Sequence, residues 1–160
     1  MIKDVIVKDA GKKGRGVFAL RSFKRGEFIF RFKRGRIIHR KDFPKLSSDD
    51  RMHLNEVDYD TYEVMRAPEK FLNHSCDPNS ITKVRSQFAL KPIRKGEEIT
   101  VDYRISAFDK NRWRCYCGSK DCKGWCISDF FTIPERLQKK YLPYTIKVIR
   151  EEYYRRHKRR

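Results

Sequence analysis

Several features are scarce in this sequence, and each shortage excludes a class of protein. No apolar run approaches the roughly 18–20 residues of a membrane-spanning helix. The first residues lack the long apolar core of a secretory signal, so we expect an intracellular protein, either cytoplasmic or nuclear (nucleoid). Acidic residues number 21 against 39 Lys and Arg, which leaves a net charge of +18. This imbalance excludes a neutral surface and favours acidic partners such as nucleic acid.

The length and the order of patterns indicate the fold class. The 160 residues are enough for one domain, and a hydrophobic share of 39% excludes disorder of the whole chain. Strand and helix patterns do not alternate, so a doubly wound nucleotide-binding fold is disfavoured. We find no internal repeat and no low-complexity linker. Short strand patterns between Gly and Pro turns, followed by helical patterns, predict a mainly β fold with short helices.

Local patterns predict the individual elements. Runs of β-branched and aromatic residues bounded by turns predict strands at 2–7, 17–20, 27–32, 36–39, 59–65, 81–84, 87–90 and 98–103. Cap residues predict one helix at 47–54 and another that opens at Thr132. Pro143 separates the latter from a helix at 144–157. Residues 70–79 fit neither the helical period nor the strand period.

The five cysteines are unevenly placed. Cys76 stands alone, whereas Cys115, Cys117, Cys122 and Cys126 lie close together. Without an export signal, clustered thiols more often bind metal than form disulfides. Three thiols within eight residues predict a structural, tetrahedral zinc site whose fourth ligand is either the neighbouring Cys126 or the remote Cys76. Distance along the chain favours Cys126. The simplest alternative role is a zinc staple in a basic domain.

Four segments occur in an order that is typical of one family. They are 13–19 (Lys-Gly-Arg-Gly-Val-Phe-Ala), 71–79 (Phe-Leu-Asn-His-Ser-Cys-Asp-Pro-Asn), 96–103 (Gly-Glu-Glu-Ile-Thr-Val-Asp-Tyr) and 115–122 (Cys-Tyr-Cys-Gly-Ser-Lys-Asp-Cys). Together they resemble the SET-domain protein lysine methyltransferases that carry a post-SET zinc motif. The resemblance extends from about residue 2 to residue 126. The helical tail is similar to the segment after the core in some small, single-domain microbial members.

The resemblance implies an organisation as well as a fold. It implies a β-clip fold of several small, curved sheets, in which residues 70–79 pass under a loop in a pseudoknot-like crossing. It implies a SET domain at residues 1–108 and a post-SET zinc-binding segment at 109–130. Residues 131–160 then form a helical extension with a basic tail.

The resemblance also implies a site. The cofactor is S-adenosylmethionine, and the acceptor is a lysine side chain of a protein, which enters through a narrow channel. Tyr103 corresponds to the catalytic tyrosine. The cofactor-binding residues are Gly14, Arg15, Gly16, His53, Asn73, His74, Tyr103 and Trp125. The zinc ligands are Cys76, Cys115, Cys117 and Cys122, which leaves Cys126 as a spare.

Val101 departs from a common family pattern. Many members carry Phe or Tyr two residues before the catalytic tyrosine, where the side chain limits how many methyl groups fit. The smaller valine predicts a substrate channel that admits higher methylation states.

A free lysine has a pKa of about 10.4, so the amine must lose its proton before it can attack a methyl group. Desolvation in the channel and the positive sulfonium both favour the neutral amine, so no carboxylate base is needed.

The charge of +18 fits a protein substrate that is associated with nucleic acid. The alternatives are a non-catalytic, zinc-stapled module that binds nucleic acid, and methylation of an acceptor other than lysine. The sequence indicates neither an oligomeric state nor a membrane partner.

Overall fold

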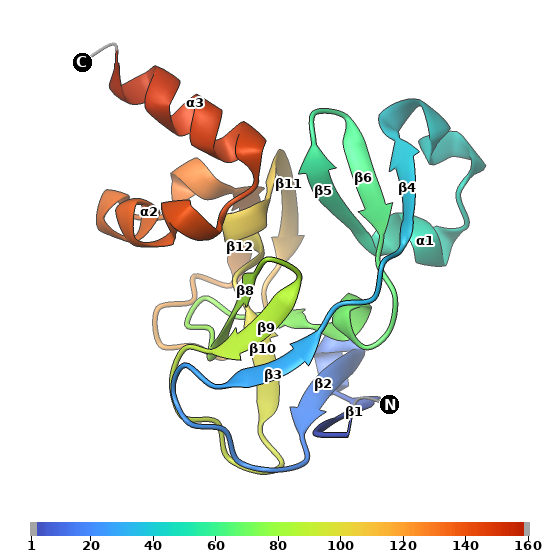
Figure 1. Cartoon of the computed structure of the whole chain (residues 1–160), viewed down its shortest axis with the longest axis vertical. Coiled ribbons are helices and arrows are strands. Elements are labelled where there is room, and N and C mark those ends of the chain that lie inside the picture. The colour runs from blue at the N-terminus through green and yellow to red at the C-terminus, as the bar shows by residue number, and fades with distance from the viewer. Residues whose placement is uncertain (1–2, 159–160) are drawn as a thin grey trace. The chain divides into compact units, whose positions relative to one another are not determined.

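In residues 3–158, which the computed structural model describes, four small β-sheets and a few short helices make up the fold (Figure 1). The strands are β1 (Val5–Asp9), β2 (Arg15–Ala19), β3 (Phe28–Arg31), β4 (Arg36–His39), β5 (Leu54–Asp58), β6 (Thr61–Val64), β7 (Asn73–His74), β8 (Ser80–Lys83), β9 (Ser86–Ala89), β10 (Glu98–Val101), β11 (Phe108–Arg114) and β12 (Trp125–Asp129). The α-helices are α1 (Ser48–Met52), α2 (Glu135–Tyr141) and α3 (Lys147–His157). Short 3₁₀ turns are η1 (Gly11–Lys13), η2 (Arg40–Lys45), η3 (Glu69–Phe71), η4 (Tyr103–Ser106), η5 (Phe130–Thr132) and η6 (Leu142–Tyr144). The predicted fold class, mainly β with short helices, is confirmed.

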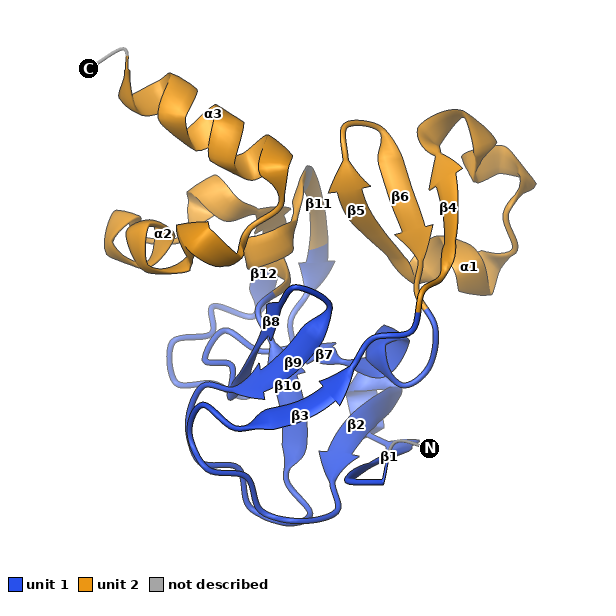
Figure 2. Cartoon of the chain, viewed as in Figure 1, with its two compact units in different colours: residues 1–33, 66–102, 113–126 blue, residues 34–65, 103–112, 127–160 orange. Residues whose placement is uncertain are grey.

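The chain divides into two compact units, which Figure 2 colours separately. Unit 1 comprises residues 1–33, 66–102 and 113–126, and unit 2 comprises residues 34–65, 103–112 and 127–160. Unit 1 contains the sheet of order β1-β2-β10-β7 and the sheet of order β3-β9-β8. Unit 2 contains the sheet of order β4-β6-β5 and the three α-helices. Strands β11 and β12 pair with each other, and each has residues in both units.

The core of unit 1 forms where β2 lies between β1 and β10. Val17 and Ile99 are directly opposite each other in the antiparallel β2–β10 pair, and both are fully buried. The remaining core residues are Val5, Ala19, Phe23, Ile29, Phe30, Leu72, Ala89 and Ile93. Burial of this apolar area stabilises the unit and fixes the register of β10, because a one-residue slip would turn Ile99 to the other face.

Strand β7 brings a distant segment beside β10. Its two residues pair in parallel with β10, so that Asn73 is opposite Thr100 and His74 is opposite Val101. The backbone N–H of Ser75 then donates to the oxygen of Val101 at 2.8 Å. This short parallel pairing explains why residues 70–79 show no period of their own.

Two segments of unit 1 repeat each other, so the expectation of no internal repeat is wrong. Residues 18–30 read Phe-Ala-Leu-Arg-Ser-Phe-Lys-Arg-Gly-Glu-Phe-Ile-Phe, and residues 88–100 read Phe-Ala-Leu-Lys-Pro-Ile-Arg-Lys-Gly-Glu-Glu-Ile-Thr. Six of the thirteen positions are identical. The repeat is hard to detect because Lys and Arg exchange between the copies and because Phe28 and Phe30 become polar in the second copy. We call these segments the first and second copy.

The two copies share a backbone conformation. The glycine in each turn has a left-handed φ, +83° in the first copy and +85° in the second. The glutamate after it accepts a hydrogen bond from the backbone N–H three residues earlier, Glu27 from Lys24 at 2.7 Å and Glu97 from Arg94 at 2.9 Å. The copies also bond to each other through an isolated antiparallel bridge.

Unit 2 has a smaller core under its sheet, formed by Ile38, Leu46, Tyr62 and Val64. Helix α1 begins as predicted, because Ser47 accepts the N–H of Asp50.

Four strands, β5, β7, β11 and β12, were not predicted from the sequence. Strand β5 reads Leu-Asn-Glu-Val-Asp and β11 is rich in charge, so strand pairing rather than residue preference makes them extended.

Within residues 3–158, no helix has both the length and the apolar character needed to cross a membrane.

Candidate functional site

Four cysteines of unit 1 converge on one point. The sulfur atoms of Cys76, Cys115, Cys117 and Cys122 all lie within 4.8 Å of one another. Cys76 comes two residues after β7, and the others follow β11 in a tight loop closed by a bond from the N–H of Cys115 to the oxygen of Gly124. Zn–S bonds of about 2.3 Å place tetrahedral sulfurs about 3.8 Å apart, so the spacing fits one metal ion such as zinc.

Backbone donors and burial act against each other on these thiols. The N–H of Cys76 donates to the sulfur of Cys117 at 3.5 Å, and the N–H of Gly124 donates to that of Cys122 at 3.3 Å. Burial raises the pKa of Cys76 above its ordinary range and that of Cys115 to about 11. Burial also acts on Cys117, but backbone N–H donors outweigh it and lower its pKa to about 7. Cys76 and Cys115 therefore keep their protons at neutral pH unless a cation displaces them.

The fifth cysteine does not belong to this group. Cys126 is buried at 4% exposure on β12, outside the set of four sulfurs. The structure thus gathers the four cysteines that the family resemblance implies and leaves out the neighbour that distance along the chain favours.

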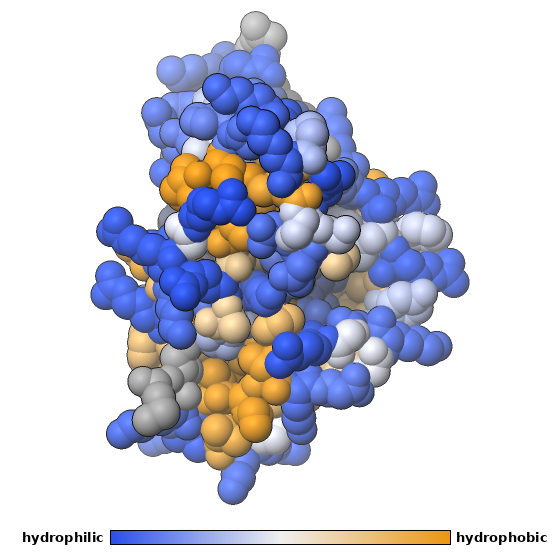
Figure 3. Space-filling model, turned by 90° about the vertical axis from the view of Figure 1, so that its right-hand side faces the viewer, coloured by the Kyte–Doolittle hydropathy of each residue, from blue (hydrophilic) through white to orange (hydrophobic). Residues whose placement is uncertain are grey.

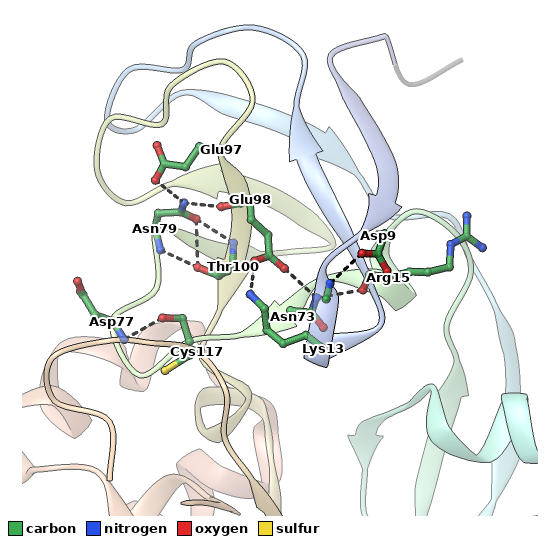
Figure 4. A network of polar contacts seen from close by, with 12 residues as sticks. Asp9, Lys13, Arg15, Asn73, Asp77, Asn79, Glu97, Glu98, Thr100 and Cys117 are labelled. Atoms are coloured by element: carbon green, nitrogen blue, oxygen red, sulfur yellow. Dashed lines mark hydrogen bonds and ion pairs between the residues drawn. The ribbon is translucent and has the colours of Figure 1, made fainter. Parts of the chain in front are cut away.

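The turn around Gly14 before β2, which we call the glycine turn, meets residues 73–79, which we call the Asn-His segment, on the same sheet (Figure 4). Asn73 donates through Nδ2 to the backbone oxygen of Arg15 at 3.0 Å and to Oε1 of Glu98 at 2.8 Å. A Cβ added to Gly16 would lie 2.7 Å from that Oε1 and 3.1 Å from Asn73 Nδ2. A side chain at this position would force Glu98 or Asn73 to shift, so the glycine permits the close approach of these chain segments.

Glu98 and Lys13 belong to this corner of unit 1 although the sequence patterns did not mark them as site residues. Glu98 accepts from Asn73 with one carboxylate oxygen and forms an ion pair with Lys13 through the other. Both side chains are largely buried, at 16% and 20% exposure. A comparison of the two copies would have identified Glu98, because Phe28 occupies the corresponding position of the first copy.

Asn79 fixes the far end of the same segment. Its Nδ2 donates to the backbone oxygen of Glu98 at 2.8 Å, and its Oδ1 accepts from the N–H of Thr100 at 2.8 Å (Figure 4). Asn79 is 4% exposed, so these bonds are needed to satisfy its amide. Residues 73–79 are therefore held against β10 at both ends.

A hollow of about 560 Å³ lies between η1 and the cysteine loop of unit 1. Its lining consists of Ala10, Lys12, Lys13, Cys115, Tyr116, Gly118, Ser119, Cys122 and Gly124. The hollow is wide open to solvent rather than enclosed. Ser119 brings to it a buried Oγ without a hydrogen-bond partner in the described residues. The predicted cofactor residues do not themselves line the hollow, but Lys13 precedes Gly14 and Gly124 precedes Trp125.

Comparison with known proteins assigns the chain to a family. Residues 14–104 match the family profile of the SET domain. The chain belongs to the SET-domain family. A relative of this SET-domain chain, the histone-lysine N-methyltransferase Set2 of Drosophila melanogaster, is 34% identical over 131 residues. The match covers 71% of this chain but 6% of Set2, so the chain spans a small part of that relative's length.

Solved structures support the SET fold. The methyltransferase domain of human histone-lysine N-methyltransferase SETMAR matches with a TM-score of 0.61 and 23% identity, over 80% of this chain and 60% of that one. KRYPTONITE, solved in complex with mCHG DNA and SAH, matches with a TM-score of 0.57 and 22% identity, over 76% of this chain and 28% of that one.

The other predicted residues of the SET domain have separate positions. Val101 is half-buried on β10 and packs against the core of unit 1. Trp125 opens β12 with 45% exposure. Tyr103 begins η4 directly after Asp102, and it belongs to unit 2. His53 also belongs to unit 2, where its Nδ1 lies 2.7 Å from the backbone oxygen of Asp49.

Proposed function

We propose that this SET-domain chain transfers a methyl group from S-adenosylmethionine to the side-chain amine of a lysine in a protein substrate. The observation that carries the proposal is the meeting of three family segments on one sheet of unit 1: the glycine turn, the Asn-His segment and the strand that leads to Tyr103. The histone-lysine methyltransferase names of its relatives suggest a histone substrate and action in the nucleus. A binding module without catalysis is less well supported, since these segments are all retained.

The proposed cofactor-binding residues are those that the family resemblance implies. In unit 1 they are Gly14, Arg15, Gly16, Asn73, His74 and Trp125, and in unit 2 they are His53 and Tyr103. When bound, S-adenosylmethionine supplies an electrophilic methyl group on a sulfonium. The glycine turn gives backbone atoms close access to a ligand, and the buried Oγ of Ser119 offers a polar contact that no protein group uses in residues 3–158.

The protein's own task is to deliver a neutral, oriented lysine amine. An apolar channel lowers the pKa of the incoming ammonium by desolvation, so the proton leaves to solvent before transfer. Tyr103 orients the amine through its hydroxyl, and Val101 gives the channel the width for higher methylation states. Positioning of this kind contributes up to about 7–11 kcal/mol in the most favourable cases.

The four cysteines are proposed as a structural zinc site, since all four positions of a tetrahedron are filled by protein sulfur. Such an ion would tie the loop after β11 to the Asn-His segment. We also propose the division into a SET domain at 1–108, a post-SET segment at 109–130 and a helical extension at 131–160.

Nucleic acid is proposed as a further partner of the basic surface. The face in Figure 3 is mostly hydrophilic, with a few separate apolar patches. The turns of the two copies present Lys24, Arg25, Arg94 and Lys95, all exposed and all without an ion pair in the described part of the chain. Cations on adjacent turns suit a phosphate backbone, whose binding releases counterions.

Transfer of labelled methyl groups tests the proposed function. The purified chain, with labelled S-adenosylmethionine, is incubated with histone octamers, with nucleosomes and with a cell lysate. We expect label in a lysine-containing protein, and di- or trimethyl-lysine by mass spectrometry at long times. Tyr103→Phe serves as the control and loses most of the transfer. Absence of transfer to every acceptor, with the cofactor shown to bind, would contradict the proposal.

A further inference from the structure

The imidazole of His74 lies between the cysteine group and the end of β10. Its Nε2 is 3.4 Å from the sulfur of Cys76, and its Nδ1 is 3.5 Å from Oδ1 of Asp102. The side chains of His74 and Asp102 are each only 4% exposed. All three residues belong to unit 1. A buried histidine with both ring nitrogens beside charged or ligating groups does more than fill space.

The surroundings hold the ring in this orientation. Trp113 contacts it edge to face, with ring centroids 5.9 Å apart. The backbone on either side is fixed by the parallel pairing of β7 with β10 and by the bond from Ser75 N–H to Val101. With so little exposure, the ring is directed toward protein groups, and a contact of His74 with the cofactor is left to its backbone.

The two neighbours of the ring are the reason to assign it a role. Cys76 is one of the four sulfurs proposed to hold the metal, and Asp102 directly precedes the proposed catalytic residue Tyr103. Groups that contact a metal ligand orient it and tune the metal, and their loss typically costs 10–100-fold in affinity or activity.

We propose that His74 is a positioning residue that couples the metal-binding cysteines to Asp102, and through the chain to Tyr103. The proposal rests on the proposed metal site and methyl transfer. It predicts that the ring slows the loss of metal and that the same contact supports the turn at Tyr103. Substitution of Cys76 or Asp102, the two neighbours of the ring, should likewise speed the loss of metal and weaken the turn at Tyr103.

The test measures release of zinc from the full chain into a chromophoric chelator, alongside kcat and KM for methyl transfer. His74→Gln and Asp102→Asn are compared with wild type, and His157→Gln on α3 is the matched control. We expect His74→Gln to release zinc about 10–100-fold faster and to lower kcat, with Asp102→Asn changing both in the same direction. The double variant releases zinc no faster than His74→Gln alone, because both changes break one link.

The possible outcomes distinguish this link, the coupling through His74, from the proposed metal site and methyl transfer on which it rests. Wild-type release rates in both variants would overturn the link, as would effects that simply add in the double variant. If His74→Gln fails to fold by circular dichroism, the isosteric Asp102→Asn decides alone. A wild-type protein that holds no zinc at all would overturn the metal site and the link together. Methyl transfer, measured separately, would then still test the proposed function.

Discussion

The two copies in unit 1 share a backbone conformation, but their side chains make different contacts. In the first copy, Phe28 and Phe30 pack against other aromatic rings: Phe28 lies edge to face on Phe88, and Phe30 stacks on Phe32. In the second copy the corresponding residues are Glu98 and Thr100. These bond to Asn73 and Asn79 and so hold the Asn-His segment.

The comparison distinguishes the residues that stabilise the fold of this unit from those that contribute to its candidate site. The shared residues, above all the turn glycine and the glutamate after it, form the same local bonds in both copies. Both strands after the turns contribute an isoleucine to the core, and the residues that differ decide whether the strand also bonds to the Asn-His segment. Exchange of residues between copies therefore tests function with the backbone held constant.

The largest effect is expected when the second copy receives the residue of the first. Glu98→Phe leaves the buried donors of Asn73 and Lys13 without their acceptor, at a cost of about 2–3 kcal/mol. We expect binding of S-adenosylmethionine, measured by calorimetry, to weaken roughly 30–150-fold, since each 1.4 kcal/mol corresponds to a factor of ten. The reciprocal Phe28→Glu is the control, because Phe28 is 48% exposed and lies on the other sheet. Equal weakening by both variants would remove the distinction between the copies.

The next effect concerns the residues that the copies share. Alanine in place of Gly26 or Gly96 puts a side chain at left-handed φ and costs about 1–2 kcal/mol of unfolding free energy. We expect similar losses in chemical denaturation for the two variants. Only Gly96→Ala should also weaken cofactor binding, because its turn leads into Glu98. A stability loss confined to one copy would show that the turns are not equivalent.

A smaller effect is expected from the exposed cations of the turns. Replacement of Lys24 and Arg25 by Gln, or of Arg94 and Lys95 by Gln, should each lower the salt dependence of duplex DNA binding. The slope of log K against log salt should fall by about 1–2 in each case. The measurement is a titration by fluorescence anisotropy at several salt concentrations. DNA binding that does not depend on salt concentration, or a slope that neither pair of substitutions changes, would exclude these turns as the contact with DNA.

The smallest effect is on the pH dependence of stability. The backbone N–H of Lys24 and the Arg21 side chain hold the pKa of Glu27 below its ordinary value of 4.5. Since the folded-state pKa is the lower one, the carboxylate stabilises the fold above the ordinary value, and the gain disappears as pH falls through the folded value. We expect Glu27→Gln to be less stable than wild type at neutral pH and to match it in acid. A difference in melting temperature between Glu27→Gln and wild type that stays the same at all pH values would contradict this.

The sequence predicted the family, the fold class and the segments of the candidate site, because turn glycines, cysteines and the Asn-His-Ser-Cys run are local signals. It did not predict β5 or β11, whose polar residues become extended only through pairing. Glu98 and Lys13 were missed because their ion pair joins residues 85 positions apart. The role of the His74 ring depends likewise on Asp102 and Cys76 meeting in three dimensions. Contacts between such distant segments leave no pattern in one stretch of sequence.

The central claim is that the Asn-His segment, held by Glu98, forms part of a site for S-adenosylmethionine. Calorimetric titration of the full chain with S-adenosylmethionine tests it most directly, with Asn73→Ala measured in parallel. We expect saturable binding to one site in the wild type and at least roughly tenfold weaker binding in the variant, since the amide loses two hydrogen bonds. No heat of binding in a folded wild-type chain, or equal affinity in both proteins, would contradict the claim.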